Sequence, residues 1–104
     1  MTTPLSLDTA RRGDGTFALV AAGEIDLSNV ATFAAALTHA ITQTVDDKPV
    51  TVDLSAVEYL DSGAINVLFN SADRVRVIAN PLLIPVLKVS GLADLASVTP
   101  PDTH

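Results

Sequence analysis

Residues 50–69 read VTVDLSAVEYLDSGAINVLF, and this stretch decides the fold. Its apolar residues alternate from position 50 to position 54, which predicts a buried β-strand. A turn follows, and Asp61-Ser62 then opens a helix whose apolar residues recur at i, i+3 and i+4 on one face. A strand that leads into an amphipathic helix in this way indicates a sheet with helices packed against it.

Strand and helix signals alternate along the rest of the chain. Helix starts are indicated at Ser28 or Asn29 and again at Asn80-Pro81, and Gly91 is typical of a helix end. Turn residues at 11–15 are expected to join the first two strands in a hairpin. Strands are predicted at residues 5–10, 16–23, 75–79 and 95–98. The expected fold class is therefore α/β, with a mixed sheet of about five strands and helices packed on it.

The composition of the chain limits the functions that it can have. The 104 residues are expected to form one domain, with an ordered core at 5–98 and a frayed tail at 99–104. A net charge of −6 argues against nucleic acid as a partner, because phosphate backbones attract basic surfaces. The chain has no cysteine, which excludes disulfides and thiolate metal sites, and no motif calls for a metal or cofactor. Neither a signal peptide nor an apolar run of bilayer length is visible, which predicts a soluble, cytoplasmic protein without membrane insertion.

Ser62 is the residue with the clearest chemical role. A serine in the first turn of a helix lies where free N–H groups and the helix dipole favour a negative group, so Ser62 is a candidate phosphate acceptor. The alternative is structural, because a serine at this place can be an ordinary N-cap worth roughly 1 kcal/mol. Hydrolase activity is not expected, since His39 and His104 are the only histidines and Ser62 does not lie in a Gly-x-Ser-x-Gly elbow.

Four short patches of the sequence occur in an order that points to one family. The central patch is residues 61–68, Asp-Ser-Gly-Ala-Ile-Asn-Val-Leu, and the strand and turn at 52–57 precede it. Upstream stands Gly23-Glu24-Ile25-Asp26, and downstream stands Val89-Ser90-Gly91-Leu92. These patches resemble the STAS domain family, which contains the bacterial anti-sigma factor antagonists. That family has Gly-Glu-Leu-Asp at the end of its second strand and Leu-Ser-Gly-Leu at the end of its third helix. The likeness spans about residues 5–98 and implies a STAS fold.

The resemblance implies a binding switch and not an enzyme. In stand-alone STAS proteins of this size, the serine that matches Ser62 is phosphorylated by a partner anti-sigma factor that is itself a serine kinase. The unphosphorylated form binds that kinase and frees a sigma factor for transcription, and a PP2C-type phosphatase restores this form. The residues expected to contact the partner are Asp26, Asp61, Ser62, Gly63, Ala64 and Asn66. Three of them depart from the family pattern, because many relatives have serine or threonine at Gly63 and glycine at Ala64 or Asn66.

Two other readings of the same family likeness stay open. Small STAS subunits of ABC-type lipid transporters also carry an aspartate-serine or aspartate-threonine motif, and they brace an ATPase. A degenerate STAS scaffold would keep Ser62 only as a helix cap. Neighbouring genes for a kinase or sigma factor would support the antagonist, and genes for a permease and an ATPase would support the transporter subunit.

Overall fold

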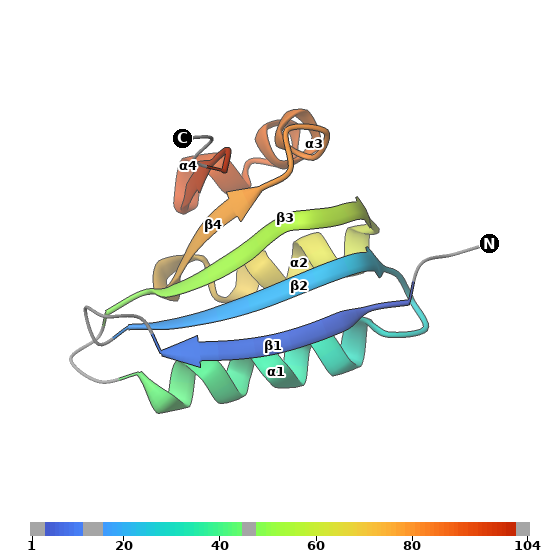
Figure 1. The fold of residues 1–104 in the computed structure, drawn as a ribbon. Coiled ribbons are helices and arrows are strands. Elements are labelled where there is room, and N and C mark those ends of the chain that lie inside the picture. Colours follow the sequence, from blue (N-terminus) through green and yellow to red (C-terminus); the bar gives the residue numbers. More distant parts are fainter. Residues whose placement is uncertain (1–3, 12–15, 45–47, 102–104) are drawn as a thin grey trace.

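A five-stranded mixed sheet forms the centre of the fold (Figure 1). The computed structural model describes residues 4–11, 16–44 and 48–101. In chain order the elements are β1 (Ser6–Arg11), β2 (Phe17–Ile25), α1 (Val30–Gln43), β3 (Val50–Leu60), α2 (Ser62–Asn70), the 3₁₀ helix η1 (Ala72–Arg74), β4 (Val75–Ala79), α3 (Ile84–Val89), α4 (Leu92–Leu95) and β5 (Ser97–Thr99). The predicted fold class is confirmed. The turn predicted at 11–15 lies outside the described residues except for Arg11.

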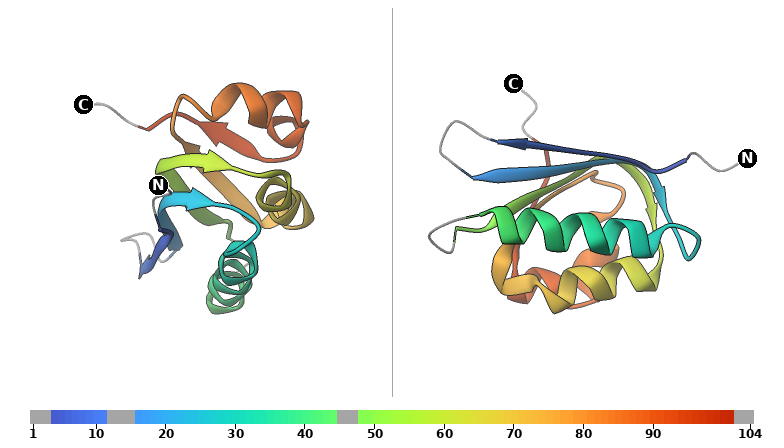
Figure 2. Two further views of the ribbon diagram at one scale, coloured as in Figure 1. Left: turned by 90° about the vertical axis from the view of Figure 1, so that its right-hand side faces the viewer. Right: turned by 90° about the horizontal axis from the view of Figure 1, so that it is seen from below.

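The sheet follows the strand order β1-β2-β3-β4-β5. β1 pairs with β2 in the antiparallel sense, and the three other pairs are parallel. Each parallel pair therefore needs a crossover, and α1 and α2 supply the first two. Figure 2 shows α1 and α2 on the same face of the sheet. The short helices α3 and α4 lie beside the β4–β5 edge in Figure 1. Because β2, β3 and β4 run the same way, their carboxyl ends meet at one edge of the sheet.

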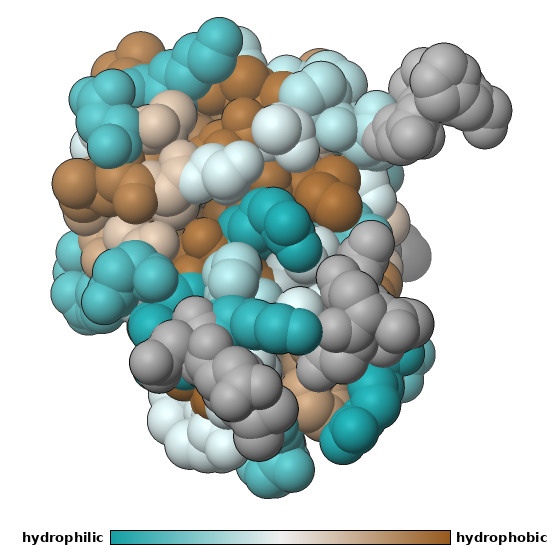
Figure 3. All heavy atoms as spheres, turned by 90° about the vertical axis from the view of Figure 1, so that its left-hand side faces the viewer, coloured by the Kyte–Doolittle hydropathy of each residue, from teal (hydrophilic) through white to brown (hydrophobic). Residues whose placement is uncertain are grey.

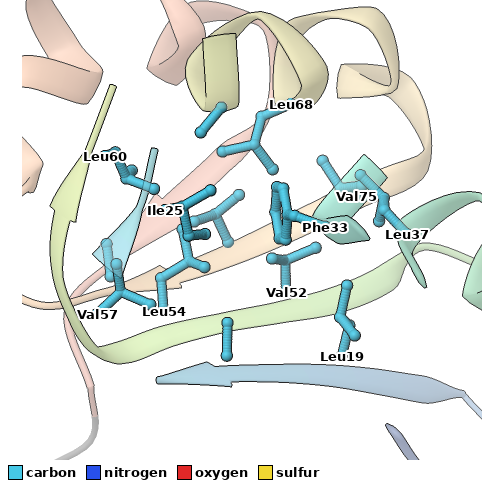
Figure 4. Packing of buried hydrophobic residues seen from close by; sticks show 14 of the residues in the cluster. Leu19, Ile25, Phe33, Leu37, Val52, Leu54, Val57, Leu60, Leu68 and Val75 are labelled. Carbon is cyan, nitrogen blue, oxygen red and sulfur yellow. The ribbon is translucent and has the colours of Figure 1, made fainter. Parts of the chain in front are cut away.

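The core lies between the sheet and its helices. Leu19 on β2 and Val52 on β3 point toward Phe33 and Leu37 on α1 (Figure 4), and all four side chains are buried. Leu68 of α2 fills the neighbouring space. The alternate residues of the strands lie on the other face, as the period of two requires; Val20 is exposed there, while Ala18 and Thr51 are buried. Burying these apolar side chains, each worth roughly 1.5–3 kcal/mol, supplies the main force that holds the helices on the sheet.

β3 is longer than the sequence indicated. The expected turn after residue 54 is wrong, because the strand continues to Leu60 and keeps its pairing with β2. The register shifts twice. Between Val20 and Ala22, two residues of β2 pass against three of β3, and between Gly23 and Glu24 one residue of β2 passes against two of β3. These irregularities are β-bulges, which break the alternation that marks a strand in the sequence. Asp53 stabilises the first bulge, since its Oδ1 accepts hydrogen bonds from the Ser55 amide at 3.0 Å and the Ser55 hydroxyl at 2.6 Å.

The last third of the chain differs from the expected helix and strand. The helix predicted to start at Asn80-Pro81 begins only at Ile84, because the Asn80 side chain holds a turn. Its Oδ1 accepts from the Leu82 amide at 3.1 Å, and its Nδ2 donates to the Val57 carbonyl at 3.3 Å. Gly91 ends this helix as predicted, with a φ of 91°.

The last strand also starts later than the sequence indicated. The strand predicted at 95–98 is displaced to β5, since Leu95 belongs to the additional helix α4. Thr99, which the sequence placed in the frayed tail, pairs with Ile78. Residues 102–104 of that tail lie outside the described residues.

Candidate functional site

The site lies at the edge of the sheet where β2 and β3 end. The Asp61 amide donates a hydrogen bond to the Ile25 carbonyl at 3.1 Å and so ties the two strand ends together. This contact brings the turn between β2 and α1 beside the start of α2. A shallow pocket of about 390 Å³ opens between the two segments, and its lining consists of Asp26, Leu27, Ser28, Tyr59, Asp61 and Ser62. The expectation that Asp26 lies near Ser62 agrees with this geometry.

Asp61, and not Ser62, caps α2. Its Oδ1 accepts a hydrogen bond from the Ala64 amide at 3.0 Å, and its backbone is extended, as an N-cap requires. The reading of Ser62 as an ordinary N-cap is therefore wrong. Ser62 is the first residue of the helix, its side chain is exposed, and no hydrogen bond to its hydroxyl is found within the described residues. The hydroxyl of Ser62 is thus free to meet a partner.

The first turn of α2 can also receive a negative group. The amides of Ala64 and Ile65 are occupied by the side chain and the carbonyl of Asp61. The amides of Ser62 and Gly63 are the first two of the helix and have no acceptor within it. They lie next to the Ser62 hydroxyl, at the positive end of the helix dipole. A phosphate on Ser62 would therefore find two backbone donors without any refolding of the helix.

The turn between β2 and α1 is held by its own side chains. Asp26 Oδ1 accepts hydrogen bonds from the Ser28 hydroxyl at 2.5 Å and the Ser28 amide at 2.9 Å. These two bonds, in that order, lower the pKa of Asp26 from its ordinary value of 3.8, so its carboxylate is charged at neutral pH. Asn29 accepts from the Asp26 amide and donates to the Glu24 carbonyl, each at 2.9 Å. Asn29 precedes α1, but neither its side chain nor that of Ser28 caps the helix as predicted.

The three remaining predicted contact residues lie differently with respect to the surface. Ala64 is buried, so its side chain cannot reach a partner, and it serves the site only through the amide that Asp61 holds. Gly63 is half-buried and close to α1, because a Cβ there would lie 3.2 Å from Asp61 Oδ1 and 3.7 Å from Val30 Cγ2. Asn66 is exposed on the next turn of α2.

Two residues of the site were missed by reasoning from the sequence. The side chain of Leu27 is 84% exposed and that of Tyr59 is 48% exposed, and both line the pocket beside Ser62. Leu27 stands between two polar turn residues, where an apolar side chain has no core to enter, and this signal was available in the sequence. Tyr59 could not be placed, because it lies in the part of β3 that follows the bulges.

Comparison with family models matches residues 9–98 to a family described as Mlab, STAS domain. The chain belongs to the STAS domain family. Comparison with curated protein sequences found no match. The family resemblance of the sequence patches is thereby confirmed, since the matched region includes all of them.

Solved structures share the fold of this STAS domain. An anti-sigma factor antagonist from Mycobacterium paratuberculosis is 22% identical, with a TM-score of 0.80, over 94% of this chain and 87% of that one. The anti-sigma factor antagonist SpoIIAA in its unphosphorylated form is 19% identical, with a TM-score of 0.66, over 90% and 88% of the two chains. The Bacillus cell fate determinant SpoIIAA in its phosphorylated form is 19% identical, with a TM-score of 0.61, over 90% and 91%. At these identities the likeness establishes a common STAS fold.

In this STAS domain the helices are short or amphipathic. Within residues 4–11, 16–44 and 48–101, none of them has the length and apolar character that a bilayer crossing requires. The described surface next to Ser62 is instead built from turn residues and strand ends.

Proposed function

We propose that this STAS domain is an anti-sigma factor antagonist that switches partners through Ser62. Unphosphorylated, it binds an anti-sigma factor with serine kinase activity in the cytoplasm and so releases a sigma factor for transcription. Phosphorylation of Ser62 by that kinase ends the complex, and a PP2C-type phosphatase restores binding. The domain acts as a substrate and binding module and not as an enzyme. The observation that carries the proposal is the exposed Ser62 hydroxyl, which caps nothing and stands at the start of α2.

The geometry of α2 suits a reversible phosphate. Phosphorylation adds about −1.5 to −2 charges next to the carboxylates of Asp26 and Asp61. Repulsion from these carboxylates is offset by the free amides of the first helical turn, so the helix keeps its structure. The domain itself therefore stays folded while the surface around Ser62 changes in charge and bulk. Such a change affects binding to a partner far more than it affects the stability of the fold.

The proposal is tested with purified anti-sigma serine kinases from the source genome. Each kinase is incubated with the domain and ATP, and phosphate is mapped by mass spectrometry. We expect label on Ser62, and calorimetry should show that Ser62→Asp binds the kinase at least about tenfold more weakly than Ser62→Ala. Ser97→Asp is the matched control, because Ser97 is exposed on β5, away from the site. Absence of label with every cognate kinase, together with wild-type signalling by Ser62→Ala in cells, would refute the proposal.

A second candidate is an accessory subunit of an ABC-type lipid transporter. The family model that matches residues 9–98 is described as Mlab and not as an anti-sigma factor antagonist, which keeps this candidate in place. It predicts that the domain co-purifies with an ATPase subunit and that Ser62→Asp does not act as a signalling switch. A pull-down from the source organism with the Ser62→Ala and Ser62→Asp forms side by side separates the two candidates.

A further inference from the structure

Leu27 and Tyr59 place exposed apolar surface directly beside Ser62. Leu27 is the second most exposed large apolar side chain among the described residues, and both residues line the same pocket as Ser62. Leu27 is also held in place, because Asp26 and Ser28 close the turn around it. A fixed apolar side chain in water forgoes roughly 1.5–3 kcal/mol of burial, which a partner can recover on binding. A rigid anchor of this kind loses little conformational entropy when the complex forms.

The charged residues of the two segments that carry Leu27 and Tyr59 all have the same sign. Four carboxylates stand at this edge of the sheet, on Glu24, Asp26, Glu58 and Asp61, and residues 22–30 and 56–66 contain no lysine, arginine or histidine. The described basic residues of the strands lie toward the opposite end, since Arg11 ends the antiparallel β1 and Arg76 is near the start of β4. In Figure 1 the ends of β2 and β3 are on the right of the view, and the end of β1 and the start of β4 are on the left. The pocket beside Ser62 is thus lined by the carboxylates of Asp26 and Asp61, and Glu24 and Glu58 lie near the ends of the same two strands; these four residues are called the acidic rim.

We propose that Leu27 and Tyr59 form the apolar centre of a docking surface for a protein partner that presents an apolar side chain ringed by arginine or lysine. This inference rests on the proposed function, because the surface includes Ser62 and the partner is then the anti-sigma kinase. The pocket receives the apolar side chain of the partner, and the acidic rim pairs with its basic residues. Aromatic and large aliphatic residues at the centre of an interface commonly carry most of its binding energy.

The same surface explains how a phosphate would release a basic partner. Attraction between exposed charges at the rim is worth only about 0–1 kcal/mol for each pair. A phosphate on Ser62 would stand beside the pocket that the partner's apolar side chain is to fill, and burying its charge against that side chain costs several kcal/mol. The free-energy cost of burying the phosphate exceeds the gain from charge pairs at the rim, so the phosphate blocks the pocket and prevents binding. This is called the plug mechanism below. A bulky neutral residue at Ser62 should therefore also prevent binding, which a purely electrostatic switch does not predict.

The α3–α4 surface provides the matched control. Leu82, Val86, Val89 and Leu95 are exposed there, and apolar surface is visible in the upper half of Figure 3, where these helices lie. Leu82 is 76% exposed and follows a strand end in a turn, as Leu27 does. It differs from Leu27 in having no carboxylate in residues 79–84. Equal truncations of Leu27 and Leu82 therefore remove the same group from two equally accessible places.

The experiment begins with photo-crosslinking in the source organism. Benzoylphenylalanine replaces residue 27, 59 or 82 of the full chain, and the crosslinked protein is identified by mass spectrometry. We expect one and the same protein at positions 27 and 59 and not at position 82. Failure of positions 27 and 59 to crosslink, or crosslinking of the same protein at position 82, overturns the docking surface.

The identified protein is then purified, and its binding is measured by calorimetry. Leu27→Ala should weaken binding about tenfold or more, Ser62→Met should weaken it to a similar degree, and Leu82→Ala should stay within about twofold of the wild type. Binding should also weaken as salt is raised from 50 to 500 mM. The Debye length then falls from about 14 to about 4 Å, so the attraction between the charges of the rim and those of the partner is screened. Leu27→Ala tests binding without a folding defect, because the leucine has no core contacts to lose.

The two hypotheses fail in different ways. A partner that phosphorylates Ser62 but binds Leu27→Ala as tightly as the wild type overturns the docking surface and leaves the proposed function standing. A partner that depends on Leu27 supports the docking surface even when no cognate kinase labels Ser62 and Ser62→Ala signals as the wild type does, which is the result that refutes the proposed function. Wild-type binding by Ser62→Met would overturn the plug mechanism.

Discussion

Replacing Asp61 by alanine should destabilise the domain by about 1–2 kcal/mol. The Asp61 carboxylate accepts a hydrogen bond from the Ala64 amide at 3.0 Å and caps α2, whereas the other long helix, α1, has no side-chain cap. Loss of an N-cap costs about 0.5–2 kcal/mol. Ala64 is fully buried, so water cannot replace the missing acceptor, and an unpaired buried amide costs about 1–3 kcal/mol. The two figures describe the same lost bond, and their overlap gives the expected 1–2 kcal/mol.

Urea denaturation followed by far-UV circular dichroism measures this loss, because the chain has no tryptophan for fluorescence. With an m-value of about 2 kcal/mol/M, the midpoint should fall by about 0.5–1 M urea. Asp61→Asn should recover most of the stability, since asparagine caps a helix about as well as aspartate. Ser62→Ala should change stability by less than about 0.5 kcal/mol, because Ser62 is exposed and caps nothing.

Comparison of the two neighbouring variants, Asp61→Ala and Ser62→Ala, decides which residue caps α2. If Ser62→Ala cost as much as Asp61→Ala, or if Asp61→Ala left the midpoint unchanged, then Asp61 would not be the cap. The free hydroxyl on which the proposed switch depends would then be engaged in holding the helix.

Two further predictions concern the turns around the site and the C-terminal helices. Ser28→Ala should raise the pKa of Asp26 toward 3.8, because it removes the hydroxyl that stabilises the carboxylate, and a carboxyl chemical-shift titration reports the change. The folded-state pKa of Asp26 lies below its unfolded value, so the stability that its carboxylate contributes is present at neutral pH and is lost as the pH falls through the folded-state pKa. Acid unfolding of Ser28→Ala should show less of this pH dependence, because the amide of residue 28 still donates to the carboxylate. Gly91→Ala should cost about 1 kcal/mol in urea denaturation, because a φ of 91° strains alanine, while the nearest atom to the new Cβ, Phe69 Cζ at 3.5 Å, leaves room for it. Gly91→Asn should cost less, since asparagine tolerates this conformation, and equal losses for both variants would point to crowding instead of strain.

Local patterns of the sequence were enough for the elements that bury one clear face. Alternation around Val52 predicts β3, and helical spacing around Phe33 predicts α1, because burial on one face imposes a period of two or of about 3.6 residues. The same patterns fail in β3 beyond residue 54, where two bulges interrupt the alternation. They fail again before α3, because the turn at Asn80 is held by a hydrogen bond to Val57, which is distant in the sequence.

The sequence by itself determined that an aspartate and a serine stand at the start of a helix that follows a buried strand. Only the tertiary structure decided which of the two is the cap, because that choice depends on where β3 stops pairing with β2. The bond from the Asp61 amide to Ile25 marks that point, and it leaves Ser62 as the first helical residue with an open hydroxyl. The same pairing brings Leu27 beside Ser62, since parallel strands end at a common edge, and contacts across such an edge leave no local trace in the order of residues.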